Sequence, residues 1–155
     1  MVLKTLCDHL DREQIRYTVI SHSPAFTAQE IAAASHISGR NLAKTVMVHI
    51  DGELAMAVLP ANLHVDVGVL GELSGAVHIE MAHEADFRDY FPGCETGAMP
   101  PFGNLFGLPV YVARELTDDE FIAFNAGSHT ELIQMHYHDF ERLVQPRVFD
   151  FSALV

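Results

Sequence analysis

Two β-prone segments separated by only two residues constrain this fold more than any other part of the sequence. Residues 44–50 and 53–59 are mostly apolar, and Asp51 and Gly52 stand between them. An Asp-Gly pair suits the two-residue turn of a β-hairpin. The pattern therefore predicts an antiparallel hairpin over residues 44–59, ended by the Pro60-Ala61-Asn62 stretch.

The rest of the chain reads as helices and short strands around this hairpin. Thr27 and Glu30 have the spacing of a capping box, which predicts a helix over residues 28–36, and Gly39 suits its exit. The other expected helices cover residues 2–14, 66–73, 82–90 and 137–144, and the other expected strands cover 17–22, 76–81, 108–112, 121–124 and 131–135. This order predicts an α+β fold with a mixed, mostly antiparallel, barrel-like sheet and surrounding helices.

The segment from Phe91 to Gly107 differs in character from the rest of the chain. It holds three prolines and four glycines in 17 residues, which excludes a regular helix or a central strand. Its apolar side chains predict a packed loop. Residues 97–103 are then either a rigid Ω-type loop or a place where backbone N–H groups bind an anion or oxyanion.

The length and the cysteine content place further bounds on the protein. A chain of 155 residues fits a single domain, expected over residues 1–155. No apolar run approaches the roughly 18 residues of a membrane-spanning helix, so no membrane association is expected. Cys7 and Cys94 are too few for a disulfide framework or a cysteine-based zinc site, and a reducing cytoplasm is the expected compartment.

Acidic residues outnumber basic ones, but unevenly along the chain. Nine Lys and Arg face 21 Asp and Glu, which gives a formal charge of −12. Residues 1–50 hold five of the bases and four of the acids, a net charge of +1, so residues 51–155 carry −13. The excess of acid disfavours a broad grip on a nucleic-acid backbone, and no DNA partner is expected. An anionic ligand would approach the first third of the chain.

Several familiar active sites are missing from the sequence. There is no Gly-x-Ser-x-Gly elbow, phosphate-binding Gly-rich loop, Rossmann fingerprint or His-Glu-x-x-His motif. The closest groupings among the ten histidines are His64 with Asp66, His78 with His83, and His136 with His138. Pairs without a third ligand are weak indicators of a metal site, so no metal is expected. A metal hydrolase built on the first of these pairs is the weakest alternative.

Lys44 is a candidate for function because of its position. It begins an otherwise almost wholly apolar strand and directly follows the slightly basic first third of the chain. A solvated lysine at the end of a strand and a functional cation both fit this placement. The residues around it leave the two open.

Five stretches of the sequence, in this order and spacing, resemble the YbaK/ProX family. They are His22-Ser-Pro-x-x-Thr27-Ala28-x-Glu30-Ile31, Lys44-Thr45, Leu59-Pro60, Gly97-Ala-Met-Pro100-Pro101-Phe-Gly103, and the ending Asp139-Phe-x-x-Leu143 with Pro146-Arg-Val-x-Asp-Phe151. The likeness covers nearly the whole chain. It implies a stand-alone relative of the editing domain inserted in bacterial prolyl-tRNA synthetases.

This resemblance implies a trans-editing deacylase, which hydrolyses the ester bond of a mischarged aminoacyl-tRNA. Lys44 matches the family lysine required for activity, which is thought to position the 3′-terminal nucleotide and the aminoacyl carbonyl. The residues expected to bind the substrate are His22, Thr27, Gly97, Ala98, Met99, Pro100, Gly103, Gly127, Ser128 and His129. Met99-Pro100-Pro101 stands where several members have smaller residues, so the identity of the amino acid does not carry over.

The implied reaction needs no metal or other cofactor. Water attacks the carbonyl, loop N–H groups stabilise the oxyanion, and Lys44 fixes the acceptor end. The general base stays open among the 2′-hydroxyl of the tRNA, the amino or side-chain group of the substrate, and His129. The expected partners are the acceptor end of aminoacyl-tRNA and an aminoacyl-tRNA synthetase. The alternative function is a non-catalytic module that binds a nucleotide or an aminoacyl-adenylate-like ligand in the same pocket.

Overall fold

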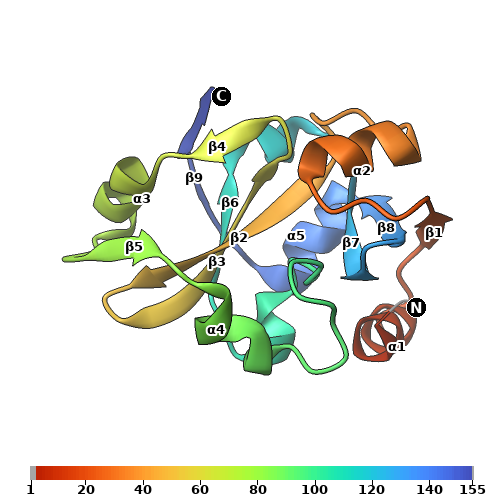
Figure 1. Ribbon diagram of the computed structural model, residues 1–155, viewed down its shortest axis with the longest axis horizontal. Helices are drawn as coiled ribbons and strands as arrows, with labels where there is room; N and C mark the ends of the chain where they lie inside the picture. The colour runs from red at the N-terminus through yellow and green to blue at the C-terminus, as the bar shows by residue number, and fades with distance from the viewer. Residues whose placement is uncertain (1–2, 155) are drawn as a thin grey trace.

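Three β-sheets with helices packed around them make up the computed structural model, which describes residues 3–154 (Figure 1). The strands are β1 (Tyr17–Ser21), β2 (Ala43–Ile50), β3 (Glu53–Pro60), β4 (Leu63–Val65), β5 (Ile79–Met81), β6 (Val110–Ala113), β7 (Phe121–Ser128), β8 (Glu131–His136), β9 (Arg147–Phe149) and β10 (Ser152–Leu154). The helices are α1 (Lys4–Arg12), α2 (Ala28–Ser35), α3 (Val67–Ser74), α4 (Glu84–Phe87) and α5 (Tyr137–Val144). The sheet orders are β5-β2-β3-β6-β9, β1-β8-β7 and β10-β4.

The predicted hairpin is confirmed as the pair β2 and β3. The two strands are antiparallel from Ala43 opposite Pro60 to Ile50 opposite Glu53. Asp51 and Gly52 have φ angles of 50° and 84°, the left-handed conformation that this two-residue turn requires. Strand β3 lies between β2 and β6 and is buried from residue 54 to residue 60. A central strand covered on both faces explains the continuous apolar run in its sequence.

The sheets are mixed and mostly antiparallel, as predicted, but they do not close into a barrel. The pairs β3–β6 and β6–β9 are parallel, and the other ladders are antiparallel. Within residues 3–154, β5 and β9 are the two edges of the five-stranded sheet. A closed barrel needs a continuous ladder, whereas a single bridge between Leu42 and Ala123 joins this sheet to the three-stranded one. That bridge places the start of β2 beside β7.

Most predicted elements are present, with changes at their ends. The capping box of α2 is confirmed, because Glu30 N–H donates to the Thr27 hydroxyl over 3.1 Å and the Glu30 carboxylate accepts from Thr27 N–H over 3.2 Å. The helix ends at His36, whose φ is 59°, so the prediction that Gly39 forms its exit is wrong. The helix expected over 82–90 is α4 followed by a 3₁₀ turn at Arg88–Tyr90.

Other boundaries also moved. The strand expected over 76–81 shortens to β5, and β7 continues to Ser128 through a bulge instead of ending at residue 124. Strands β4, β9 and β10 were not predicted, since three residues are too few for a periodic pattern. The first helix starts at Lys4, and the beginning of its predicted range lies outside the described residues. A single domain over 1–155 stays a prediction.

The loop over residues 91–107 is packed into the core, as its apolar residues predicted. Phe102 is fully buried, and its ring centroid lies 5.6 Å from that of Phe124 and 5.4 Å from that of Phe140. A methyl group on Gly103 would lie 2.7 Å from both the Leu108 carbonyl oxygen and Cγ2 of Val110. Residues 98–103 of the loop are therefore a buried structural element. Among the described helices, none is long and apolar enough to cross a membrane.

Candidate functional site

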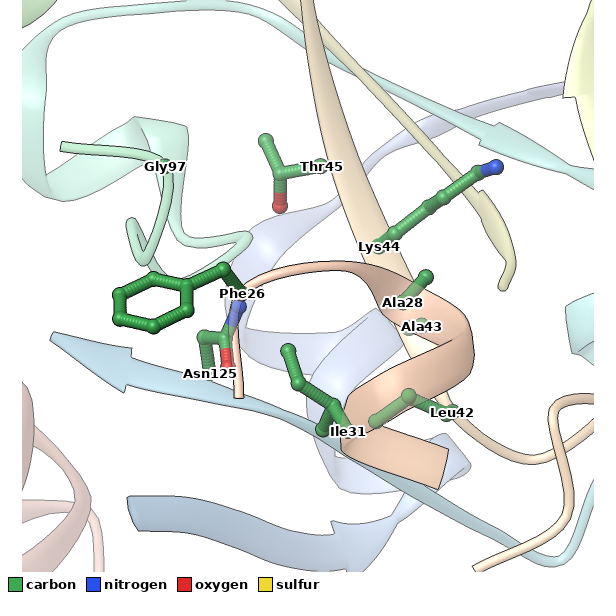
Figure 2. Close-up of a pocket in the computed structure, with 9 residues that line it drawn as sticks. All are labelled: Phe26, Ala28, Ile31, Leu42, Ala43, Lys44, Thr45, Gly97 and Asn125. Carbon is green, nitrogen blue, oxygen red and sulfur yellow. The ribbon is translucent and has the colours of Figure 1, made fainter. Parts of the chain in front are cut away.

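A cavity of about 170 Å³ lies where the start of β2 meets the N-terminal end of α2, strand β7 and the tip of the 91–107 loop (Figure 2). Its lining residues are Phe26, Ala28, Ile31, Leu42, Ala43, Lys44, Thr45, Gly97 and Asn125. Four segments that are distant in the sequence thus share one concave surface. The bridge between the two larger sheets brings two of them together.

Lys44 is the one charged residue in this lining, and its charge is partly removed from water. Its Nζ donates a hydrogen bond of 3.3 Å to the carbonyl oxygen of Ala61. Burial lowers the pKa of the Lys44 ammonium below its ordinary value. In Figure 2 its side chain extends from β2 away from Gly97, while Thr45 leaves the strand on the opposite side. The ammonium therefore stands at one end of the cavity and the loop tip at the other.

The first wall of the cavity consists of aliphatic side chains and one aromatic ring. Ala28 and Ile31 come from α2, and Leu42 and Ala43 precede Lys44 on the chain. Phe26 is 67% exposed, and its ring centroid lies 4.7 Å from that of His129. A large apolar ring that is exposed beside a cavity can pack against a bound group, and this contact removes the ring from water. This wall therefore offers an apolar surface to part of a bound molecule.

Asn125 supplies an amide to the opposite wall. It lies on β7 opposite Leu132 and two residues after Ala123, so the alternation of the strand puts its side chain on the same face as Ala123, toward the cavity. Its Oδ1 atom is buried and has no hydrogen-bond partner in the described part of the chain. An unsatisfied buried acceptor costs stability, so a ligand that donates to it gains a hydrogen bond. Asn125 is therefore a candidate polar contact that the sequence did not predict.

Gly97 is the part of the proline-rich loop that reaches the cavity. Its φ of 88° lies in the region that favours glycine. Its N–H lies 3.3 Å from the Met99 sulfur, a weak acceptor that a stronger one can replace. The Ala98 N–H already donates to the carbonyl oxygen of Glu95 over 3.0 Å. Of these two amides, Gly97 is thus the candidate donor to an oxyanion.

Backbone and side-chain hydrogen bonds fasten this loop tip to β7. Glu95 N–H donates to the Gly127 carbonyl oxygen over 2.8 Å, and Gly127 N–H donates to the Ala98 carbonyl oxygen over 3.0 Å. The His129 Nε2 lies 3.0 Å from the Thr96 carbonyl oxygen, so this nitrogen must carry the proton. The other ring nitrogen, Nδ1, is buried and has no hydrogen-bond partner among the described residues. This geometry makes His129 a clamp on the loop and withholds its basic nitrogen from water.

The structure brings only some of the predicted site residues to the cavity. Lys44 and Gly97 line it together. Other predicted residues lie outside this lining and have structural roles: Thr27 caps α2, Ala98, Met99, Pro100 and Gly103 are buried, Gly127 and His129 hold the loop tip, the Ser128 hydroxyl bonds Thr130, and the His22 ring lies 2.7 Å from the Ser23 carbonyl oxygen. Their contact with a substrate stays a prediction.

Sequence reasoning missed Phe26, Thr45 and Asn125 as site residues. Thr45 follows Lys44 directly, and Phe26 immediately precedes the capping box, so both lay within recognised stretches. Asn125 had no local signal, because the predicted strand ended at residue 124 and the other residues that line the cavity are distant in the sequence. Among residues 3–154, no three His, Cys, Asp or Glu side chains are grouped to hold a metal ion. The side chain of Asp66 instead caps α3 by accepting from Val69 N–H over 3.1 Å.

Comparison with known proteins assigns the chain to a family. Residues 22–143 match the family model of the aminoacyl-tRNA editing domain, and the chain belongs to that family. The resemblance to YbaK/ProX proteins is thereby confirmed.

Individual relatives agree with this assignment. The chain is 29% identical over 151 residues to the Multifunctional Ser/Thr-tRNA deacylase ProXp-y of Escherichia coli strain K12, covering 92% of this chain and 87% of that protein. It is 22% identical over 151 residues to the Prolyl-tRNA editing protein ProX of Acetoanaerobium sticklandii, covering 94% and 92%. Its fold matches the crystal structure of a proposed trans-editing enzyme for prolyl tRNA synthetase with a TM-score of 0.80 and 19% identity, covering 97% and 96%.

Proposed function

We propose that this chain is a deacylase that hydrolyses the ester bond of a mischarged aminoacyl-tRNA in trans. The observation that carries the proposal is the partly buried ammonium of Lys44 at the end of an otherwise uncharged cavity, in a chain of the editing-domain family. A cation in this position attracts the phosphates and ester of an acceptor end, while the apolar wall receives the amino acid. The relatives named above as tRNA deacylase and editing protein support the same activity.

The reaction follows from these positions. A water oxygen attacks the ester carbonyl carbon, and the negative charge that forms on the carbonyl oxygen is stabilised by the Gly97 N–H. The bond between the carbonyl carbon and the ribose oxygen then breaks, and the ribose oxygen takes up a proton. The products are a free amino acid and an uncharged tRNA. Lys44 holds the acceptor end so that the ester faces the attacking water.

The proton of the attacking water needs an acceptor. His129 is poorly placed for this role, because its Nε2 is engaged by Thr96 and its Nδ1 is buried. The 2′-hydroxyl of the terminal ribose and the amino group of the substrate remain as general bases, and both arrive with the substrate. An aminoacyl ester is already labile, so this modest catalytic assistance suffices.

The proposed partners follow from the net charge of the chain. The chain carries a formal charge of −12, so its contact with tRNA is confined to the acceptor end around Lys44. An aminoacyl-tRNA synthetase that holds the rest of the tRNA would supply the missing affinity. Because aminoacyl-tRNA is made and used in the cytoplasm, the proposal places the protein there, acting as a single domain.

The decisive experiment is a deacylation assay on a panel of tRNAs, each mischarged with a different amino acid. We expect the wild type to release at least one amino acid, and Lys44→Ala to lower kcat/KM by about 10²–10³-fold, the loss typical of removing one electrostatic contact to the transition state. Lys4 is the only other lysine of the chain and is exposed on α1, where it pairs with Asp8. Lys4→Ala is therefore the matched control and should keep full activity.

The alternative function predicts a different result in the same experiment. A non-catalytic module would bind an aminoacyl-adenylate analogue, as a rise in melting temperature, and would release no amino acid from the complete panel. That outcome would contradict the deacylase proposal.

A further inference from the structure

A second hollow adjoins the cavity on the outer side of α2. It has a volume of about 250 Å³ and is lined by Ala28, Gln29, Ala32, Gly39, Ala61 and Asn62. We call these six residues the α2 groove. Ala28 lines both the α2 groove and the cavity, so the two hollows meet at the first residue of the helix.

Lys44 also contacts both hollows. Its stem lines the cavity, and its ammonium donates to the carbonyl oxygen of Ala61, a residue of the α2 groove. Ala61 is itself fixed, because its N–H lies 2.8 Å from the Leu42 carbonyl oxygen and 3.0 Å from the Gly39 carbonyl oxygen. The ammonium therefore stands at the junction of the two hollows, held against a rigid segment.

The α2 groove has the surface that a flat, uncharged ring requires. Its floor consists of alanine methyl groups and the backbone at Gly39, where a methyl group would lie 3.4 Å from the Asn62 Cβ atom. None of its six residues is charged. Side chains this small leave an open apolar face, against which a planar group can be removed from water.

Two side-chain amides stand at the rim of this apolar floor. Gln29 and Asn62 are exposed, and in the described part of the chain neither side chain forms a hydrogen bond. Each amide offers a donor and an acceptor side by side. Asn and Gln use this pair to recognise the edge of adenine, and proteins that bind single-stranded RNA read base edges in the same way.

We propose that the α2 groove binds the adenine base of the 3′-terminal nucleotide of tRNA, with Gln29 and Asn62 reading its edge. The inference rests on the proposed function, which puts the ester carbonyl at the Gly97 N–H and the rest of the acceptor end at Lys44. The ester and the base are attached to the same ribose, so with the ester at Gly97 and the ribose at the ammonium the base can extend to the far side of Lys44. The α2 groove is the hollow on that side of Lys44, and every tRNA ends in adenosine.

The first test uses adenosine 5′-monophosphate (AMP) as the probe and nuclear magnetic resonance as the readout. Titration of ¹⁵N-labelled protein with AMP should shift the side-chain amide signals of Gln29 and Asn62 and the backbone amide of Ala32. Uridine 5′-monophosphate carries the same phosphate and should shift them less. The proposal is overturned if AMP moves none of these signals, or if the uridine nucleotide moves them equally.

The second test places the same change inside and outside the α2 groove. Ala32 lines the α2 groove, whereas Ala33 is exposed on the same helix and lies outside it. Ala32→Glu puts bulk and negative charge where the base would lie, while Ala33→Glu adds the same charge as a matched control. With mischarged tRNA as substrate, we expect Ala32→Glu to raise KM on the order of tenfold, equivalent to about 1.4 kcal/mol of binding. Ala33→Glu should leave KM near the wild-type value.

These two tests separate the inference from the function on which it rests. If the two glutamate variants have equal KM values, or if Ala32→Glu still gives the full AMP shifts, the α2 groove does not hold the base. If the wild type hydrolyses no mischarged tRNA, the deacylase proposal fails, and the AMP titration still decides whether the α2 groove is an adenine site.

Discussion

The two walls of the cavity are built in different ways. The wall of residues 26–45 consists of a capped helix and the start of a strand, so regular secondary structure fixes most of it. The wall of residues 95–129 depends on bonds between distant segments, such as Glu95 N–H to the Gly127 carbonyl oxygen and His129 to the Thr96 carbonyl oxygen. We call the wall of residues 26–45 the regular wall and the wall of residues 95–129 the loop wall. Lys44 lies on the regular wall, and the Gly97 N–H, the candidate oxyanion donor, lies on the loop wall.

This difference teaches which substitutions should affect which property. A change on the regular wall should alter chemistry and leave the fold nearly intact, because the capping box of α2 and the β2–β3 hairpin hold its backbone. A change in the loop wall should first cost stability or positioning, since hydrogen bonds to β7 and packing in the core hold the loop tip in place. Three predictions test this contrast, from the largest expected effect to the smallest.

Gly103→Ala should produce the largest effect, and it should appear as lost stability. The added methyl group would lie 2.7 Å from the Leu108 carbonyl oxygen and from Cγ2 of Val110. Overpacking of this kind typically costs about 1–3 kcal/mol. Urea unfolding measures the change.

Gly68→Ala is the matched control for this substitution. Gly68 lies in α3, where an added methyl group meets nothing closer than the Asp66 carboxylate at 3.6 Å. Alanine favours a helix over glycine by up to about 1 kcal/mol, so this variant should be slightly more stable than the wild type. Equal free energies of unfolding for the two variants would show that the loop wall is not held by the core as described.

The contrast between local and distant contacts also explains what the sequence could predict. The hairpin turn at Asp51–Gly52 and the Thr27–Glu30 capping box are local patterns, and both are confirmed. Strands β4, β9 and β10 exist because partner strands supply their hydrogen bonds, which three residues of sequence do not reveal. The sheets do not close into a barrel for a related reason. Closure depends on hydrogen bonds between edge strands that are distant in the sequence.

The residues of the candidate site also differ in how well the sequence predicted them. Lys44 was marked by its position on an apolar strand and by the family resemblance, and the cavity contains it. The resemblance marked the whole 97–103 loop, but only Gly97 lines the cavity, because burial directs the next residues into the core. Asn125 was missed since the predicted strand ended at residue 124, one residue before it, whereas β7 continues to Ser128.

His129→Ala should have the next largest effect, as a loss of loop positioning. Without the hydrogen bond from Nε2 to the Thr96 carbonyl oxygen, the Gly97 N–H is no longer held at the cavity. We expect kcat for deacylation to fall roughly tenfold, as for the loss of about 1.4 kcal/mol of transition-state stabilisation. Single-turnover assays with saturating protein measure this rate.

His129→Gln distinguishes a clamp from a general base. Glutamine can donate a side-chain N–H to the same carbonyl but cannot accept and release a proton at neutral pH, so a clamp should be largely restored. Loss of a general base would instead lower the rate by about 10²–10⁴-fold in both variants. A His129→Gln rate as low as that of His129→Ala, with a loss of this size, would contradict the clamp.

The smallest expected effect concerns the two lysines, whose ionisation should influence stability in opposite directions. Burial lowers the pKa of Lys44 from its ordinary value of 10.5, whereas the hydrogen bond to Asp8 raises that of Lys4. Between the lowered pKa of Lys44 and 10.5, the unfolded chain binds more protons at this residue than the folded chain, so the Lys44 contribution to stability rises with pH. The contribution of Lys4 is present below 10.5 and declines as pH rises through its raised pKa.

Urea unfolding of Lys44→Met and Lys4→Met beside the wild type, from pH 7 to pH 11, isolates these contributions because the other groups cancel in each difference. Lys44→Met should gain most over the wild type at neutral pH, where the wild type holds a charge away from water, and this gain should shrink as the pH approaches 10.5. Lys4→Met should show the opposite slope. Parallel slopes would mean that Lys44 is as well solvated as Lys4, and the regular wall would then lose the property that sets its cation apart from an ordinary surface lysine.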